Sequence, residues 1–238
     1  MKRASSSDPL ALSSIVRTYQ PALLEHIRAR FRLSPADAED IVSDFFADKI
    51  LNPSFMERAK QHRGRFRFLV KTSLERYAID WLRRADNHSL AVSPGRLAQL
   101  DQNTIKNEAT EENVDSFDRI WAETVVSICL KCTEAHFADT KQAHYWRFFL
   151  DRYINPLRTG RPPGPYEDSI RKFGFATVAA ASNALVTVKR VLRRVLREVV
   201  SRYETDQPEE EVNHLKVIME NSADAVLARV LKIIESEM

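Results

Sequence analysis

The chain has 238 residues, of which 44% are hydrophobic and 29% are charged, and its formal net charge at pH 7 is only +3. A chain of this length can bury one large or two small cores. Five Gly and few alternating β-branched runs argue against a sheet protein. The small net charge excludes nucleic-acid binding by overall charge, so any such affinity needs local asymmetry.

Apolar residues recur with a period near 3.6 through most of the chain, which predicts an all-α fold. No segment reaches the uncharged apolar length of a membrane span; the nearest, Phe173–Val188, is too short and contains polar residues. The N-terminal stretch MKRASSSDPLALSS lacks the apolar core of a secretory signal. We therefore expect a cytoplasmic protein that makes no membrane contact.

The N-terminal part of the chain predicts a tail and a helix. Residues 1–9 are expected to be disordered because they are mostly polar. Apolar residues then recur at helical spacing from Leu10 to Leu33. Pro21 lies inside this run and is expected to break or kink the helix.

A second helix is predicted to begin at Ser34, which suits an N-cap, and to run to about Leu51. At 100° per residue one side is apolar and includes Ala38, Ile41, Val42, Phe45 and Phe46. An adjacent side is acidic and holds Asp37, Asp40, Asp44 and Asp48. The first two also suit the positive end of the helix dipole. The stripe fits docking on a basic partner as well as simple solvation.

The most informative stretch is Arg63–Arg84, RGRFRFLVKTSLERYAIDWLRR. Its basic residues are Arg63, Arg65, Arg67, Lys71, Arg76, Arg83 and Arg84, opposed by Glu75 and Asp80. Its interleaved aromatic residues are Phe66, Phe68, Tyr77 and Trp81. Cations bind a polyanion without regard to sequence, and aromatic faces stack on unpaired bases. The pattern favours nucleic-acid binding over a solvated basic helix that is packed by its aromatic residues.

The following segments predict a linker and more helices. Residues 87–114 are polar, lack aromatic side chains and are expected to be a linker. Helical spacing returns from Phe117 to Tyr153, and Asn155–Pro165 is predicted to be a loop because of its Pro and Gly content. Tyr166–Phe173, then Gly174 and a long helix over Thr177–Tyr203, have the layout of a helix-turn-helix.

The last part of the chain, residues 205–238, is predicted to be an amphipathic helical extension. Glu204–Glu211 is an acidic break, and two segments with apolar stripes follow, Val212–Glu220 and a helix capped by Ser222. An apolar stripe of this kind has to be buried against the second domain, a partner or a second copy.

Two cysteines, Cys129 and Cys132, share one helical face with His136. A metal site at this spacing is geometrically conceivable, but a structural zinc site normally closes with four ligands, and no second Cys pair exists. Free Cys also packs as a small apolar residue. We interpret these positions as core, and we expect neither a metal nor a cofactor.

The stretch AEDIVSDFF (Ala38–Phe46), followed by the Arg63–Arg84 segment, resembles the core-binding and −10-reading domain of an RNA polymerase sigma factor of the extracytoplasmic-function type. The segment VTVKRVLRRVLREVV (Val186–Val200) resembles the end of the −35-reading domain in planctomycete and acidobacterial relatives. The resemblance covers about residues 10–220. It implies a region 2-like bundle at 10–86 and a region 4-like helix-turn-helix domain at 115–204, joined by the flexible linker.

The resemblance also implies site residues. The helix around Ala38–Phe46 would face core RNA polymerase through Asp37, Asp40, Ile41, Asp44 and Phe46. The basic helix would engage promoter DNA on the −10 side through Arg63, Arg65, Lys71, Arg76, Arg83 and Arg84. The second domain would contact the −35 side through Thr177, Ser182, Asn183, Thr187, Lys189 and Arg190. Asp80 would be structural.

The sequence departs from the family pattern at several positions. Ser43 replaces the usual Gln, Leu69 the usual Trp, and Arg76 the usual Asn. The relatives also carry Lys and Arg near Ser182 and Thr187, where this chain is small and uncharged. We therefore expect −35 binding to be weaker or to have a different sequence preference.

The expected function is that of a sigma factor, which binds core RNA polymerase, directs promoter recognition and opens promoter DNA with its first domain. No phosphate-binding Gly loop, paired His/Asp constellation or activated nucleophile indicates an enzyme. An anti-sigma factor or a regulatory kinase is a further expected partner. Two alternatives remain: a helix-turn-helix repressor on a sigma-like scaffold without polymerase contact, and a helical regulator that docks through the C-terminal stripe.

Overall fold

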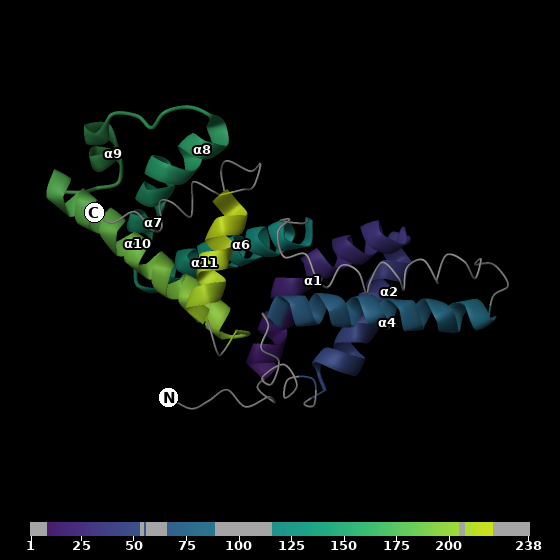
Figure 1. The fold of residues 1–238 in the computed structure, drawn as a ribbon. Coiled ribbons are helices and arrows are strands. Elements are labelled where there is room, and N and C mark those ends of the chain that lie inside the picture. Colours follow the sequence, from purple (N-terminus) through teal and green to yellow (C-terminus); the bar gives the residue numbers. More distant parts are fainter. Residues whose placement is uncertain (1–8, 53–54, 56–65, 89–115, 205–207, 221–238) are drawn as a thin grey trace. The chain divides into compact units, whose positions relative to one another are not determined.

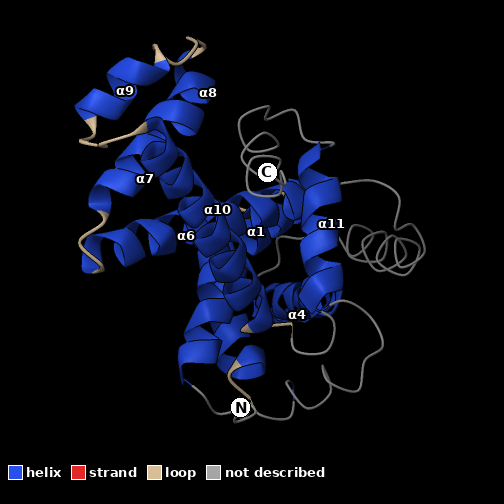
Figure 2. Cartoon of the chain, turned by 90° about the vertical axis from the view of Figure 1, so that its left-hand side faces the viewer, coloured by secondary structure: helices blue, strands red, loops and turns tan. Residues whose placement is uncertain are grey.

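In the computed structural model the described residues are 9–52, 55, 66–88, 116–204 and 208–220. They form helices and no strand, which confirms the predicted all-α class for this part of the chain (Figure 2). Contacts divide the chain into a first unit, Met1–Trp121, and a second unit, Ala122–Met238. This division falls inside helix α6 (Ser116–Asp139), whereas the sequence places the domain boundary at residue 115.

The first unit is built from α1 (Pro9–Phe31), α2 (Pro35–Phe45), the π-helical turn η1 (Phe46–Ile50) and α4 (Phe66–His88) (Figure 1). Helices α1, α2 and α4 pack against one another in pairs. Their core is aromatic and aliphatic, with side chains that include Ile15, Tyr19, Leu23, Ile27, Ile41, Phe45, Val70 and Leu74.

Helix α1 continues through Pro21, so the expected break is wrong. Proline removes one backbone donor and costs about 3 kcal/mol in a helix interior. Tyr19 and Leu23 are fully buried on either side of the exposed Pro21. Burial of such side chains contributes roughly 1.5–3 kcal/mol each, which offsets the cost of the proline.

The predicted start of α2 is confirmed. The Asp37 N–H donates to Ser34 Oγ at 3.1 Å, and Pro35 occupies the first helical position. The Ser34 hydroxyl in turn donates to Asp37 Oδ2 at 2.7 Å. The helix passes into η1 and ends at Ile50, one residue before the predicted end.

The second unit contains the rest of α6, then α7 (Ala143–Phe149), the π-helical turn η3 (Leu150–Ile154) and α8 (Asn155–Thr159). Helix α8 corrects the loop predicted for Asn155–Pro165. Its first turn contains Pro156, which suits that position, and Gly160 ends it with φ of 67°. The loop is confined to residues 160–165.

A helix-turn-helix follows, as predicted: α9 (Tyr166–Lys172), a turn, and α10 (Val178–Ser201). Gly174 adopts φ of 76° in the turn, a conformation that favours glycine. Thr177 caps α10 by accepting a hydrogen bond from the Ala180 N–H at 3.1 Å.

Helix α11 (Pro208–Glu220) packs on α10. It begins with Pro208 and three glutamates, within the segment predicted to be an acidic break, because proline and carboxylates both suit a first helical turn. Its buried residues Val212, Leu215 and Ile218 confirm the predicted apolar stripe. The predicted N-terminal tail, the helix capped by Ser222 and nearly all of the predicted linker lie outside the described residues.

Candidate nucleic-acid interface

The exposed basic surface of the first unit lies on the second half of α4. Arg76, Arg83 and Arg84 are exposed and lie within about 100° of one another around the helix axis. Asp80 lies among them, with Arg83 Nη1 3.7 Å from its Oδ1 and Arg84 Nε donating to its backbone carbonyl at 3.2 Å. An exposed ion pair of this kind is weak, so it does not fix the arginine side chains in place. Three cations against one carboxylate leave the surface basic.

Lys71 does not belong to this surface. It precedes Arg76 by five residues, which places it about 140° away around the helix axis. It is half-buried, and its Nζ lies 5.6 Å from the centroid of the Phe117 ring at the start of α6. The predicted DNA-facing role of Lys71 therefore does not share a face with the three arginines. Arg63 and Arg65 lie outside the described residues.

Arg67 is buried in the first unit and is not a surface cation. Its side chain has no exposed area, and its Nε lies 3.0 Å from Asp118 Oδ1. Its guanidinium also lies 4.7 Å from the Phe68 ring centroid and 5.1 Å from that of Trp121. Desolvation of an arginine is tolerated when a carboxylate and aromatic faces surround it. Arg67 therefore holds the start of α6 against α4.

Glu75, an acidic residue in the basic stretch, is buried as well. Its Oε1 lies 2.6 Å from His26 Nε2 and 3.5 Å from Arg30 Nε, both on α1. The carboxylate is therefore used inside the unit and does not neutralise the exposed arginines. Asp80 is the exposed acid of α4 among the residues 66–84, whose side chains the structure describes, and it lies next to the three arginines.

The aromatic residues divide between core and surface. Phe66 and Tyr77 are buried; their rings pack edge-on against Tyr19 and Phe45, respectively, with centroids 5.7 Å apart in each pair. Phe68 and Trp81 are partly exposed. The expectation that all four could accept unpaired bases is corrected, because only the latter two offer ring surface outside the core.

Tyr77 links the basic helix to the acidic one. Its hydroxyl donates to Asp48 Oδ2 at 2.7 Å. Burial, the hydrogen bond and charge of Asp48, and the charge of Asp44 raise the pKa of Tyr77 to about 12, while the charge of Arg84 acts in the opposite sense. The hydrogen bond therefore joins α4, which carries the exposed arginines, to η1 at the end of the acidic helix.

The acidic face of α2 is exposed at Asp40 and Asp44. Asp37 is exposed too, but it caps the helix together with Ser34. Ile41 has no exposed area and Phe46 only 6%, so both side chains belong to the core. This corrects their expected position on a polymerase-facing surface. They lie on the inward side of the helix, about 100° or more from Asp40.

The six predicted −35-side residues of α10 differ in accessibility. Thr177 is the N-cap, and the Ser182 and Tyr166 hydroxyls lie 3.2 Å apart. The Thr187 hydroxyl donates to the Asn183 backbone carbonyl at 2.8 Å. Lys189 is half-buried, with its Nζ 5.2 Å from the Tyr153 ring centroid. Burial and the charge of Arg193 lower the pKa of this lysine. Asn183 and Arg190 are exposed.

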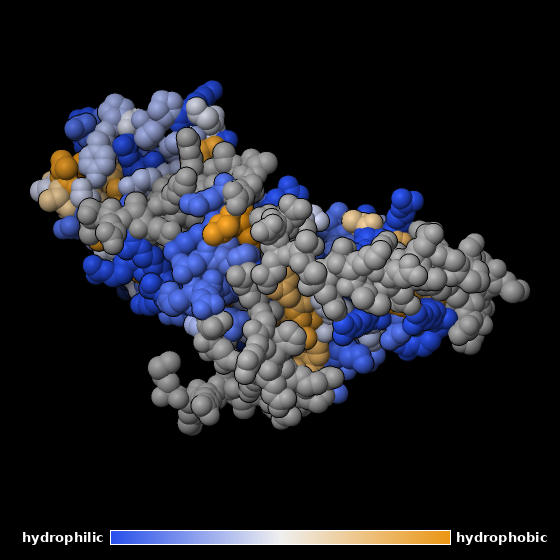
Figure 3. Space-filling model, in the orientation of Figure 1, coloured by the Kyte–Doolittle hydropathy of each residue, from blue (hydrophilic) through white to orange (hydrophobic). Residues whose placement is uncertain are grey.

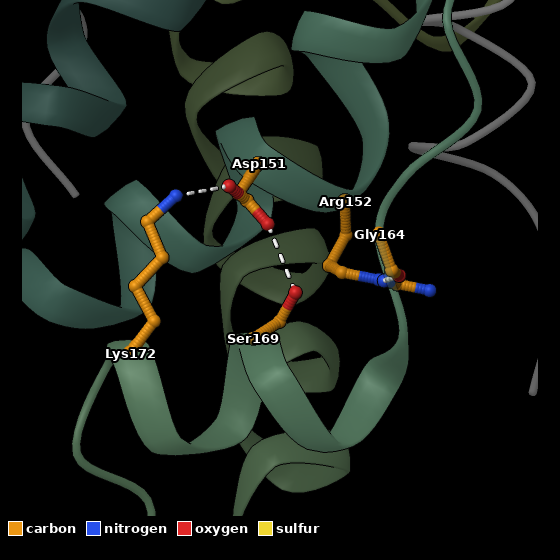
Figure 4. Close-up of polar contacts among 5 residues, drawn as sticks. All are labelled: Asp151, Arg152, Gly164, Ser169 and Lys172. Atoms are coloured by element: carbon orange, nitrogen blue, oxygen red, sulfur yellow. Dashed lines mark hydrogen bonds and ion pairs between the residues drawn. The ribbon is translucent and has the colours of Figure 1, made fainter.

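Sequence reasoning missed the polar contacts that anchor α9 (Figure 4). Asp151, in η3, accepts hydrogen bonds from the Ser169 hydroxyl at 3.0 Å and from Lys172 Nζ at 2.8 Å. Arg152 Nη1 donates to the Gly164 carbonyl at 2.6 Å. These partners are 12 to 21 residues apart, so no helical spacing signals them. They position the first helix of the helix-turn-helix.

Of the two cysteines, Cys129 lies in the core, as expected. This residue is buried, and burial raises the pKa of its thiol to about 12, which disfavours the thiolate that metal binding requires. Within the described ranges, no group of three His, Cys, Asp or Glu side chains is arranged to hold a metal ion. Of the helices described, none combines the length and apolar character needed to cross a membrane.

Comparison of the chain with protein-family models, with curated proteins and with solved structures found no match.

Proposed function

We propose that the protein is a sigma factor that binds core RNA polymerase and promoter DNA through adjoining surfaces of its first unit. The observation that carries the proposal is the junction at Tyr77. Its hydroxyl, on the helix that carries the exposed Arg84, donates to Asp48 at the end of the helix that carries the exposed Asp44. The acidic face suits a basic protein surface, and the basic face suits the phosphates of DNA.

Two further features support this proposal. The sequence of α2 and α4 resembles the family's core-binding and −10-reading segments. Asp40, Asp44, Arg83 and Arg84 are exposed there, as is Arg76, which replaces the usual Asn. The second unit carries a helix-turn-helix, a motif whose second helix enters the major groove of duplex DNA. The promoter would be bound by both units, and the polymerase would perform the chemistry.

The docking half of the proposal is tested with Asp44→Lys. Like-charge contact in a polymerase interface costs several kcal/mol, so we expect at least a tenfold loss of affinity for core polymerase, measured by pull-down and by fluorescence anisotropy. Glu39→Lys is the matched control, because Glu39 is exposed on the same helix about 140° away. It should bind like the wild type. Wild-type affinity in Asp44→Lys would refute the docking surface.

A helix-turn-helix repressor without polymerase contact is the second candidate. It is favoured by the first half of α10, Val178–Val188, which lacks the Lys and Arg expected of a −35-reading helix. Run-off transcription on a genomic fragment library, with and without added core polymerase, separates the two. A sigma factor directs new transcripts only when core polymerase is present. A repressor yields none, and binds duplex DNA equally well in either case.

A further inference from the structure

The outward face of α10 has two chemically different halves. Its inward face consists along its length of buried residues such as Ala184, Val188, Leu192 and Val199. At 100° per residue, the outward arc spans about 80° and contains Ala179, Asn183, Val186, Arg190, Arg194 and Arg197. The first half is therefore small and uncharged, and the second half is basic. Figure 3 shows apolar surface over the start of α10.

Asn183 is the amide that the first half presents. The nearby Ser182 hydroxyl lies against that of Tyr166, and the Thr187 hydroxyl donates to the backbone of α10 itself. Both hydroxyls are thus engaged within the unit. Asn183 is exposed; on the same arc the exposed Ala179 lies one turn before it and the partly exposed Val186 lies just after it. A duplex that meets this face would encounter one amide set among methyl groups.

These groups have a defined preference among base edges. An Asn amide pairs in bidentate fashion with N6 and N7 of adenine, and apolar side chains contact the thymine methyl group. Guanine is read by Arg or Lys, and Val178–Val188 contains neither. The base-reading half of the helix is therefore complementary to A·T pairs and lacks the groups that select G·C pairs.

The basic half suits the DNA backbone. Arg190 lies seven residues beyond Asn183, about 10 Å along the helix axis, and is exposed. Arg194 and Arg197 follow on the same arc, with carboxylates of Glu198 and Glu209 at 3.6 Å and 2.8 Å, respectively. Cations at this distance from the base-reading turn bind phosphates, which adds affinity but no sequence information. Arg190 is the first exposed cation after Asn183 on the face.

We propose that the second unit selects A·T-rich duplex DNA through Asn183 and holds the adjacent phosphates through Arg190. The proposal rests on the duplex-binding part of the proposed function and names the sequence class that this part recognises. It also accounts for a helix-turn-helix that lacks cations at its base-reading turns. Affinity comes from the second half of α10 and specificity from the first.

The test uses the full chain and two sets of fluorescent duplexes of equal length, one enriched in A·T pairs and one in G·C pairs, with affinity measured by anisotropy. The wild type should favour the A·T set. Asn183→Ala should reduce this preference by about tenfold, within the range for loss of one bidentate base contact. Alanine suits a helix, so folding should be retained. Asn213→Ala, a matched exposed amide on α11, should leave the preference unchanged.

Two further variants test the division of roles. Asn183→Arg should move the preference toward G·C duplexes, because arginine pairs with guanine O6 and N7. Arg190→Ala should weaken binding to both sets equally and reduce the slope of log affinity against log salt by about one. An unchanged preference in both Asn183 variants would overturn the proposal, as would a loss of preference in Arg190→Ala.

The outcome is separable from that of the sigma proposal. If core polymerase gives no transcripts while Asn183 controls an A·T preference, the sigma function fails and the duplex-reading inference stands. If transcription depends on the protein while Asn183 variants keep the wild-type preference, the inference fails and the sigma function stands.

Discussion

The position of Arg67 in the structure differs from the one that its sequence context suggests. In the sequence it is one of a run of cations. In the structure it is fully buried beside Asp118, and its guanidinium lies near the rings of Phe68 and Trp121. A buried ion pair of this kind adds little net stability, but loss of one partner leaves an uncompensated charge in the core.

The buried pair predicts a strongly non-additive response. Asp118→Asn and Arg67→Met should each lower the free energy of unfolding by about 3 kcal/mol, because each leaves one polar partner without its counter-charge. The double variant should cost less than the sum of the two. A double-mutant cycle from urea denaturation measures this coupling. Additive costs would mean that the two side chains do not interact.

At the scale of elements, the two π-helical turns each carry an aspartate that binds a later helix. Both η1 and η3 follow an α-helix and carry an aspartate, Asp48 and Asp151. Each carboxylate accepts a hydrogen bond from a later helix: from Tyr77 of α4 in the first unit and from Ser169 of α9 in the second. A π turn inserts an extra residue into the helical repeat and so changes the direction in which the following side chains point. Asp48 thereby contacts α4, which carries the exposed arginines of the first unit. Asp151 contacts α9, the first helix of the helix-turn-helix.

The Asp151 contacts predict an acid-sensitive anchor for α9. Partial burial acts to raise the pKa of Asp151, but the hydrogen bonds from Lys172 and Ser169 and the charges of Lys172 and Arg152 outweigh it, so the pKa lies below its usual 3.8. The carboxylate therefore stabilises the folded state above pH 3.8. This contribution is lost as pH falls through the lower folded-state pKa, because the unfolded chain binds the proton first.

Asp151→Asn tests this anchor. The variant should lower the free energy of unfolding by about 1 kcal/mol at pH 7, and its difference from the wild type should shrink as the pH is lowered below 3.8. Chemical denaturation at a series of pH values gives both quantities. Asp168→Asn, an exposed carboxylate on α9, is the control and should stay within about 0.5 kcal/mol of the wild type at pH 7. If the difference in unfolding free energy between Asp151→Asn and the wild type grew as the pH fell, the ionised carboxylate would not be the stabilising form.

At the scale of the whole molecule, the two units carry exposed cations in different surroundings. The first unit presents Arg76, Arg83 and Arg84 on one face of α4, and the partly exposed Trp81 borders this face about 60° from Arg84. Cations with aromatic faces suit unpaired strands. The second unit presents a helix-turn-helix with the exposed Asn183 and Arg190 on its second helix, an arrangement that suits duplex DNA. We therefore expect the units to act at different steps.

Paired variants test this division. Arg76→Ala should weaken open-complex formation with core polymerase more than it weakens binding to duplex DNA, because its surface is assigned to separated strands. Arg190→Ala should do the reverse. Permanganate reactivity of unpaired thymines measures opening, and anisotropy measures duplex binding. Arg28→Ala on α1 is the control, since Arg28 is exposed and pairs with Glu25. Equal losses in both assays for Arg76→Ala would count against its single-strand role.

Much of the architecture was predictable from local patterns. Apolar spacing predicted the helices, Ser34 the start of α2, and Gly174 the turn of the helix-turn-helix. These features depend on residues within one or two turns of each other. The failures at local scale came from proline: Pro21 did not end α1, and Pro156 lies in the first turn of a helix where a loop was expected.

The sequence by itself therefore determined the helical class, the order of the helices and the concentration of cations on α4 and α10. Only the tertiary structure decided which of these side chains remain at the surface. Arg67 and Glu75 are used inside the first unit, Ile41 and Phe46 face its core, and Asp48 is bound by Tyr77. The reason is physical: periodicity places a residue on a side of its helix, whereas burial and pairing depend on segments tens of residues away that pack against that side.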